Sequence, residues 1–514
     1  MATLAVPPDA CQSQDAPRLV VLIAVDQLRP DYFTRYQDQL TGGLRRFWDR
    51  GAFYTRGEQD HAVTETAPGH ATMLTGRSPA SVGIVANLLG VQDTLAPLLM
   101  VAGPGASPHR FRGTTLYDWM RAADGETQAL SISRKDRGAI LTIGRAKVPV
   151  YWYWNGILTT SRYYADTLPT WLREWNDRKG AIRLAGQTWD LLLPADKYAE
   201  PDSQPWENAG RQFVFPYQLR PDSFVVNQVW NLPWGDSLTF DAALEGVRRL
   251  GMGRRNRPDL LSVSLSNTDA VGHTWGPDSR EIQDQILRLD RWLGWFMDSL
   301  AVLVPSDRTI YVLTSDHGVT SYPEYAREHG RVAGRVLGDS VAARAELALQ
   351  QRFGGGGGRR FGLQFDNGLL YGDTTALRSA GVNVDSLASA LASQLARHTG
   401  VTRIYTPRIL AQASEGDVDA MRWRRTIPAD FPWLAAASVA PGYIWSFLPG
   451  FTTHGTTNAS DVLVPIAFLG PGIPPGRHER ARTVDIAPTL AAIIGVKPAE
   501  AVEGVVLKEV VGSR

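Results

Sequence analysis

The sequence contains a single cysteine, Cys11, among 514 residues. One cysteine excludes an intramolecular disulfide and a metal site built from several thiolates. The chain is therefore not a small domain stapled by disulfides, and its compartment stays open. No apolar run approaches the roughly 20 residues that a membrane-spanning helix needs, so the sequence predicts no membrane span.

An excess of charge of one sign is also missing. Lys and Arg together number 53, and Asp and Glu number 52, which leaves a formal net charge of +1. Such a balance produces no overall field that would attract nucleic acid or an anionic membrane. We therefore expect no nucleic acid as a specific partner.

The first residues lack the pattern of an export signal. Residues 1–18 contain neither a basic n-region nor an apolar h-region of the usual length. Two interpretations stay open, a cytoplasmic protein or a chain that begins after a removed signal. The segment Asp9-Ala10-Cys11 resembles the remnant of a lipid-attachment site, but the apolar stretch that should precede it is missing. We predict a flexible polar N-terminus over residues 1–17.

Apolar runs alternate with helical patterns from residue 18 onward. The predicted strands are Arg18–Asp26, Gln128–Ser133, Asp259–Ser266, Thr309–Thr314 and Val462–Leu469. The predicted helices are Thr114–Ala122, Phe240–Leu250, Asp278–Val304, Val384–Arg397 and Ile486–Ile494. This alternation predicts an α/β fold, with a largely parallel central sheet flanked by helices, which we take as one domain over residues 18–514.

Two stretches depart from this alternation, and we interpret them as cap insertions. Residues 149–235 carry eight of the sixteen tryptophans, many prolines and no long helical period. Packing explains these aromatics better than a substrate-binding face does. A second irregular region covers residues 320–450. It contains Gly354–Gly358, which lacks the spacing of a phosphate-binding loop and is predicted to be a flexible loop.

Six potential metal ligands follow the predicted strands or lie in Gly/Thr-rich loops. They are Asp26, Asp269, His273, Asp316, His317 and His454. Ligands of open α/β sheets bind outside the carboxyl ends of the strands, so one edge of the sheet can gather all six. Three aspartates and three histidines make two mixed nitrogen and oxygen sites with three protein ligands each. That number and type of ligand predicts two catalytic Zn²⁺ ions.

The expected nucleophile is a hydroxyl group beside these metals. Thr66 lies just before Pro68, a residue favoured in the first turn of a helix. A hydroxyl at a helix N-terminus lies in a positive local field, and a bound zinc would lower its pKa further. Thr64 is the alternative nucleophile. We interpret His61 and His70 as packing residues or as residues that support the ligands.

The order of motifs resembles one family. AVDQLRPDY, TETAPGHATMLTG, SRKDRGAI, NTDAVGHTWGP, TSDHG and FTTHGT resemble the alkaline phosphatase superfamily, and more closely its PafA-like bacterial phosphatases with a threonine nucleophile. The resemblance runs from about residue 18 to residue 496. It implies an alkaline-phosphatase-like three-layer sandwich, and phosphate monoesters and inorganic phosphate as partners. We expect a monomer in a periplasmic or secreted setting.

The same resemblance assigns roles to residues. It implies one zinc held by Asp269, His273 and His454, and another held by Asp26, Asp316 and His317. It implies that Thr66 is the nucleophile and also a metal ligand. It further implies that phosphate oxygens bind to three more residues, Asn87, Lys135 and Arg137.

Lys135 and Arg137 distinguish the possible substrates. A phosphate monoester carries two negative charges and three non-bridging oxygens, which suit two cations. The related nucleotide pyrophosphatase/phosphodiesterases lack this Lys-x-Arg segment and form the first alternative, and an inactive metal- or phosphate-binding protein is the second. A sulfatase would need a modified Cys or Ser in a C/S-x-P-x-R context, and Cys11 is not in one. We predict a zinc-dependent alkaline phosphatase that works through a phosphothreonine.

Overall fold

A computed structural model of the protein describes residues 16–353, 360–446 and 450–512. Most of the predicted flexible N-terminus, with Cys11, and the predicted glycine loop Gly354–Gly358 lie outside these described residues. Among the described helices, none combines the length and the apolar character needed to cross a bilayer.

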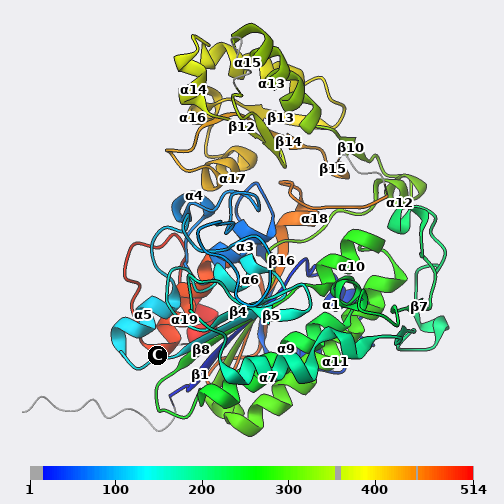
Figure 1. The fold of residues 1–514 in the computed structure, drawn as a ribbon, viewed down its shortest axis with the longest axis vertical. Coiled ribbons are helices and arrows are strands. Elements are labelled where there is room, and N and C mark those ends of the chain that lie inside the picture. The colour runs from blue at the N-terminus through cyan, green and yellow to red at the C-terminus, as the bar shows by residue number, and fades with distance from the viewer. Residues whose placement is uncertain (1–15, 354–359, 447–449, 513–514) are drawn as a thin grey trace, which may run out of the picture.

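A nine-stranded sheet forms the centre of the molecule (Figure 1). Its strands, in spatial order, are β17 (Gly476–Arg482), β2 (Ala52–Glu58), β16 (Leu463–Leu469), β9 (Thr309–Thr314), β1 (Leu19–Val25), β8 (Asp259–Leu265), β3 (Ala129–Ser133), β4 (Val150–Trp154) and β5 (Ile157–Thr159). β1 pairs in parallel with β8 and β9, and β3 pairs in parallel with β8 and β4. The five predicted strands are confirmed, although β16 runs antiparallel to its neighbours β2 and β9.

Helices cover both faces of this sheet. Along β1, Leu19, Val21 and Ile23 belong to the core on one face, and the residues between them belong to the core on the other face. The first face is covered by α1 (Tyr32–Arg35), α2 (Gly43–Arg50), α7 (Thr170–Lys179), α9 (Trp234–Leu250), α10 (Asn267–Trp275) and α11 (Arg280–Leu303). The second is covered by α3 (Thr66–Met73), α4 (Pro79–Val82), α5 (Leu116–Ala123), α6 (Asp136–Ile140), α19 (Ile486–Ile494) and α20 (Lys508–Val511). The predicted three-layer α/β sandwich is confirmed.

The tryptophan-rich stretch 149–235 divides between the sheet and its surroundings. Its first strands, β4 and β5, extend the central sheet, because β4 pairs with β3 and β5 folds back on β4. The rest forms α7, α8 (Val225–Gln228) and a two-stranded sheet of β6 (Thr188–Trp189) and β7 (Tyr217–Gln218). Trp189 is fully buried and packs edge-on against Trp275 of α10. In this part of the stretch, Trp189 therefore serves to pack the chain against α10.

Residues 334–445 form a smaller unit beside the central sheet (Figure 1). An antiparallel sheet runs in the order β11 (Gln364–Asp366), β12 (Leu369–Tyr371), β14 (Trp433–Val439) and β13 (Val401–Tyr405). Its helices are α13 (Asp339–Phe353), α14 (Thr374–Ser379), α15 (Val384–Leu395), α16 (Pro407–Gln412) and α17 (Val418–Thr426). β10 (Gly334–Val336) and β15 (Tyr443–Trp445) pair at its base, between α12 (Pro323–Glu328) and α18 (Ala459–Val462) in the chain.

An apolar cluster joins the smaller unit to the segment that carries Thr66. Ala62 and Val63 precede Thr66, and they share this cluster with Leu369 and Trp423 of the smaller unit. All four side chains are buried. The smaller unit therefore lies against the start of α3.

Candidate active site

The carboxylates of the site are placed by neighbouring parallel strands. Asp26 directly follows β1, Asp316 lies two residues beyond the end of β9, and Asp269 lies in the first turn of α10, which follows β8. Because β1 pairs in register with both β8 and β9, these three strands end at the same edge of the sheet. The predicted gathering of ligands at a strand-end edge is observed.

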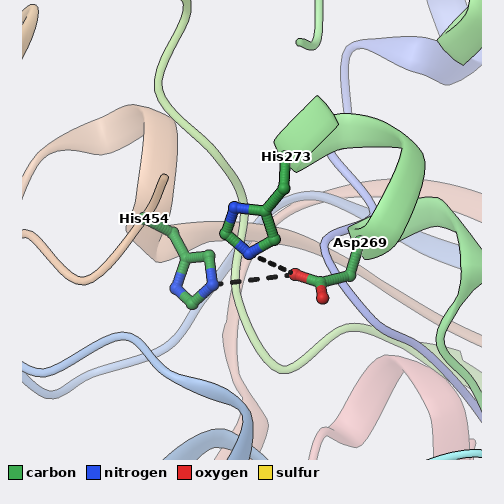
Figure 2. A group of neighbouring side chains, drawn as sticks. All are labelled: Asp269, His273 and His454. Atoms are coloured by element: carbon green, nitrogen blue, oxygen red, sulfur yellow. Dashed lines mark ion pairs between the residues drawn. The ribbon is translucent and has the colours of Figure 1, made fainter. Parts of the chain in front are cut away.

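The six predicted ligands form two groups of three. One group is Asp269, His273 and His454, and the other is Asp26, Asp316 and His317, with all ligand atoms of a group within 4.8 Å of one another. In the first group, Asp269 Oδ1 lies 3.1 Å from His273 Nε2 and 3.6 Å from His454 Nε2 (Figure 2). In the second, His317 Nε2 lies 3.3 Å from Asp26 Oδ1.

All three histidines are oriented by a backbone carbonyl. His273 Nδ1 lies 2.8 Å from the carbonyl oxygen of Thr452, and His454 Nδ1 lies 2.7 Å from that of Thr64. His317 Nδ1 lies 2.9 Å from the carbonyl oxygen of Gly318. A carbonyl only accepts hydrogen bonds, so each Nδ1 is the donor, and in the neutral ring each Nε2 presents a lone pair. Histidine ligands of metals are held in this way.

This orientation brings lone pairs face to face. His317 Nε2 and Asp26 Oδ1 are buried, and neither has a hydrogen-bond partner among the residues that the structure describes. Two acceptors that face each other in a buried place are unfavourable unless a proton or a cation lies between them. The donor set therefore fits a divalent metal such as zinc.

The charges of the site point to the same conclusion. Burial, with repulsion from Asp269 and Asp316, raises the pKa of Asp26 to about 8. Burial acts on Asp269 in the same direction, but the charges of Lys135 and His273 outweigh it and hold the pKa of this carboxyl well below its usual value. Burial, with the two neighbouring histidines, lowers the pKa of His454 well below its usual value. His454 is therefore neutral at pH 7, which is the form that binds a metal.

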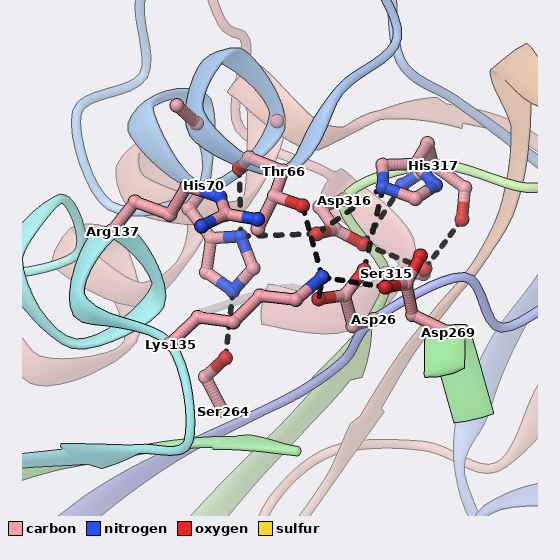
Figure 3. Close-up of polar contacts among 12 residues, drawn as sticks. Asp26, Thr66, His70, Lys135, Arg137, Ser264, Asp269, Ser315, Asp316 and His317 are labelled. Carbon is pink, nitrogen blue, oxygen red and sulfur yellow. Dashed lines mark hydrogen bonds and ion pairs between the residues drawn. The ribbon is translucent and has the colours of Figure 1, made fainter. Parts of the chain in front are cut away.

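Thr66 is the first residue of α3 and faces both groups. Lys135 Nζ lies 3.2 Å from Thr66 Oγ1, 2.5 Å from Asp26 Oδ2 and 2.7 Å from Asp269 Oδ2 (Figure 3). The hydroxyl of Thr64 instead donates a hydrogen bond of 2.9 Å to the carbonyl of Thr456. Of the two candidate nucleophiles, Thr66 is the one whose hydroxyl contacts a site residue.

A cavity of about 360 Å³ opens over these residues. Its lining includes Thr66, Asn87, Arg134, Lys135, Arg137, Asn231, Asp269, His273, Phe451 and His454. The Oδ1 atom of Asn87 accepts a hydrogen bond of 2.8 Å from the backbone N–H of Ala67, which holds this amide beside the start of α3. The three predicted phosphate-binding residues thus share one cavity with Thr66.

The sequence did not point to Gln27, which bridges the two ligand groups. Its Nε2 donates to Asp269 Oδ1 at 3.0 Å, and its backbone N–H donates to Asp316 Oδ1 at 3.1 Å. Gln27 adopts a left-handed backbone with a φ of 67°. A non-glycine residue in that region is uncommon and marks local strain. The sequence around Gln27 contains no pattern that predicts this backbone conformation. Arg134 and Asn231 were also missed as lining residues of the cavity.

His70 contacts Asp316, a member of the second ligand group. Its Nδ1 lies 2.9 Å from the carbonyl oxygen of Thr66 and 3.2 Å from Asp316 Oδ2, and its Nε2 lies 2.8 Å from Ser264 Oγ (Figure 3). The side chain is completely buried. His70 therefore connects Thr66 at the start of α3, Asp316 of the second group and strand β8.

Residues 20–335 match the model of the type I phosphodiesterase / nucleotide pyrophosphatase family. The chain belongs to this family. Two curated relatives extend the match over nearly the whole chain. Alkaline phosphatase PafA of Elizabethkingia meningoseptica is 27% identical over 530 residues, which cover 96% of this chain and 95% of PafA. Alkaline phosphatase PhoK of a Sphingomonas species is 30% identical over 526 residues, which cover 96% of this chain and 92% of PhoK.

Solved structures of PafA superpose on this family member. The crystal structure of wild-type PafA covers 99% of this chain with a TM-score of 0.89 and 26% identity, and the whole PafA chain is matched. A second structure is that of a PafA variant in which one Thr, one Asn, one Lys and one Arg are substituted. The predicted membership in the alkaline phosphatase superfamily, with a PafA-like fold, is confirmed, and it places the chain among the phosphoric ester hydrolases.

Proposed function

We propose that this protein is a two-zinc alkaline phosphatase that hydrolyses phosphate monoesters through a covalent phosphothreonine. The observation that carries the proposal is the position of Lys135 Nζ, which contacts Thr66 Oγ1 and one carboxylate of each ligand group. A nucleophilic hydroxyl, a cation and two metal-binding groups thus meet at one point. Phosphoryl transfer requires this combination of groups.

The ligand groups assign the metals. Asp269, His273 and His454 would hold one zinc, and Asp26, Asp316 and His317 would hold the other. When bound, two zinc ions lower the pKa of a nearby hydroxyl and stabilise negative charge on the attacking and leaving oxygens. The three buried carboxylates compensate most of the charge that these ions bring.

The remaining chemistry belongs to the chain. Thr66 Oγ attacks phosphorus while the bond from phosphorus to the ester oxygen breaks, so that the alcohol leaves and phosphothreonine forms. A water molecule then hydrolyses phosphothreonine, which releases inorganic phosphate and restores the hydroxyl. The N-terminus of α3 adds a positive field at Thr66. Asn87, Lys135 and Arg137 hold the non-bridging oxygens, on which negative charge is spread during transfer.

Lys135 and Arg137 favour monoesters over diesters. A monoester dianion offers two charges to two cations, whereas a diester has one of its non-bridging oxygens blocked by a second ester group. Arginine binds two oxygens at once, which rewards the unblocked phosphate. The PafA variant described above has the residue types of Thr66, Asn87, Lys135 and Arg137 substituted, and this agreement of types supports the same four roles here.

The family description supplies the second candidate function. Type I phosphodiesterases and nucleotide pyrophosphatases act on phosphate groups with two substituents, and the match to that family covers residues 20–335. A third candidate is an inactive metal- or phosphate-binding protein. Such a protein would not need a nucleophilic hydroxyl, so the presence of Thr66 argues against it. We further propose, from the resemblance to PafA, a periplasmic or secreted monomer whose partners are phosphate monoesters and inorganic phosphate.

Two variants test the proposed function. Thr66→Ala should abolish release of p-nitrophenol from p-nitrophenyl phosphate, and Thr64→Ala should retain most of it. In the wild-type enzyme, acid quenching during turnover followed by mass spectrometry should find phosphate on the peptide that contains Thr66. Full, chelator-sensitive activity of Thr66→Ala would overturn the proposal. Faster hydrolysis of bis(p-nitrophenyl) phosphate than of the monoester would favour the phosphodiesterase instead.

A further inference from the structure

A second cavity, of about 510 Å³, adjoins the cavity that contains Thr66. It lies between the smaller unit and the part of the chain that carries His273. The two cavities share His273 and Phe451. Volumes of this size are typical of sites that bind small organic molecules. Since His273 belongs to one of the two metal-binding groups, the second cavity begins directly beside the reacting centre.

The wall of this cavity is aromatic and apolar. Phe365 of β11 and Trp445 of β15 line it and pack edge-to-face with ring centroids 5.1 Å apart. Gly338 permits this arrangement, because a Cβ atom at that position would lie 2.1 Å from the ring of Phe365. Leu88, which follows Asn87 in the chain, also lines the cavity and is 64% exposed. An apolar group is thus exposed to solvent next to a phosphate-binding residue.

Carboxyl groups in the wall of the cavity affect which charge a bound molecule can carry. Asp339, which begins α13, and Asp366 of β11 both line it. No lysine or arginine is among its lining residues in the described part of the chain. Burial, with repulsion from Glu65, raises the pKa of Asp366 to about 9, so this carboxyl is charged only in alkaline solution. A negatively charged guest is then repelled, and at any pH it finds no cation to pair with, whereas a neutral or cationic guest is accepted.

A third cavity, of about 600 Å³, lies on the other side of the catalytic one and has a different character. It shares Lys135 and Arg137 with the catalytic cavity and is also lined by Arg134 and Trp154. Those cations face the non-bridging oxygens in the proposed mechanism. Lys135 Nζ lies 3.2 Å from Thr66 Oγ1, the proposed attacking atom, and in an in-line displacement the leaving oxygen lies opposite the attacking one. We therefore assign the leaving alcohol to the side of His273 rather than to the side of Lys135.

We propose that the cavity between the smaller unit and the central domain binds the alcohol part of the substrate, and that the favoured substrates are phosphate monoesters whose alcohol carries a neutral or cationic aromatic ring. This inference rests on the proposed function, since it assigns the leaving group to the side of His273. Phe365, Trp445 and Leu88 contact the ring, and a wall with two carboxyl groups and no lysine or arginine disfavours anionic rings.

Three esters test the proposal without a change in chemistry. Ethyl phosphate and 2-phenylethyl phosphate have leaving alcohols of similar acidity, so a difference in kcat/KM reports contact with the ring. A 2-phenylethyl phosphate with a para carboxymethyl group adds a negative charge to the same ring. We expect kcat/KM of the wild-type enzyme to be about tenfold higher for 2-phenylethyl phosphate than for ethyl phosphate, and the carboxymethyl group should remove this advantage.

Matched variants locate the contact. Leu88→Ala and Phe365→Ala should reduce the ratio of kcat/KM for 2-phenylethyl phosphate to kcat/KM for ethyl phosphate several-fold. Leu95→Ala, at a leucine that is 91% exposed, and Trp154→Ala, in the third cavity, should leave the ratio unchanged. Melting temperatures of all variants show whether a loss comes from unfolding, and Leu88, being exposed, is removed without that risk.

The outcomes separate the two proposals. Hydrolysis of ethyl phosphate with no preference for the ring would overturn the inference and leave the proposed function intact. A preference that is lost in Trp154→Ala but kept in Leu88→Ala and Phe365→Ala would also overturn it, because the ring would then lie in the third cavity. Absence of hydrolysis of every monoester would overturn the proposed function itself.

Discussion

The Nζ atom of Lys135 lies 3.2 Å from the Oγ1 atom of Thr66. The same Nζ forms ion pairs with Asp26 and Asp269, one carboxylate from each candidate metal-binding group. Lys135 precedes α6 and Thr66 begins α3, so two helix starts converge on the strand-end edge. This contact joins the proposed nucleophile to one of the proposed phosphate-binding cations.

Arg137→Ala should reduce kcat/KM for a phosphate monoester by about 10²- to 10³-fold, because a charge-assisted contact to two oxygens is lost in the transition state. The loss for a diester should be clearly smaller, since one of its oxygens is blocked. Steady-state kinetics with p-nitrophenyl phosphate and bis(p-nitrophenyl) phosphate measure both. Arg112→Ala, at an exposed arginine that pairs with Asp430, is the control. Equal losses on the two substrates would contradict the assignment of Arg137.

His70→Asn should weaken metal binding at the Asp26, Asp316 and His317 group by about 10- to 100-fold, because residues that orient a ligand contribute this much to affinity. His70 lies 3.2 Å from Asp316 Oδ2, and Asn is too short to keep all its contacts. Metal content after dialysis against a graded series of chelator concentrations measures the change. Ser264→Ala removes only the partner of Nε2 and should have a smaller effect. An unchanged chelator profile in His70→Asn would show that the contact is not needed.

Gly69→Ala should both destabilise the protein and reduce turnover. A Cβ atom at Gly69 would lie 2.3 Å from the carbonyl oxygen of Asp316, so α3 and the loop after β9 would have to move apart. Overpacking of this kind costs typically about 1–3 kcal/mol, and the shift would displace Thr66 from Asp316. Urea unfolding and kcat measure the two effects. Gly125→Ala, where nothing lies within 4 Å of the new Cβ, should change neither.

His61→Asn should make the stability of the protein less sensitive to acid. Burial, with Arg422 and His317 nearby, lowers the pKa of His61 to about 3, against 6.5 for a free histidine. Between these values the unfolded chain binds one proton more than the folded protein. The wild-type free energy of unfolding should therefore decrease as pH falls below 6.5, at up to about 1.4 kcal/mol per pH unit from this group.

Urea unfolding at pH 7 and pH 5 measures this effect as a difference between wild type and variant. The wild type should lose more stability over that interval than His61→Asn does. His329→Asn, at an exposed histidine, should follow the wild type. The same loss in His61→Asn as in the wild type would contradict a neutral, buried His61.

Much of the site could be predicted because it follows local patterns. Asp26 and Asp316 follow apolar runs that only a buried strand explains, and Asp269 and His273 are spaced as neighbours on one side of a helix. Gln27 could not be predicted, since its role depends on a left-handed φ and on side chains 242 and 289 residues away in sequence. The sequence shows only that Gln27 follows Asp26, and that position alone does not predict a role in the site.

The sequence by itself determined five strands of the central sheet, the helical segments between them, the Asp and His residues that follow three of these strands, and Thr66 at a helix start, because these follow from patterns within a few residues. Only the tertiary structure decided that β16 runs antiparallel between β2 and β9, that Lys135 reaches both ligand groups, and that the smaller unit closes an aromatic cavity beside His273. Strand direction and contacts between distant segments depend on how the whole chain packs, and a local pattern contains no record of that packing.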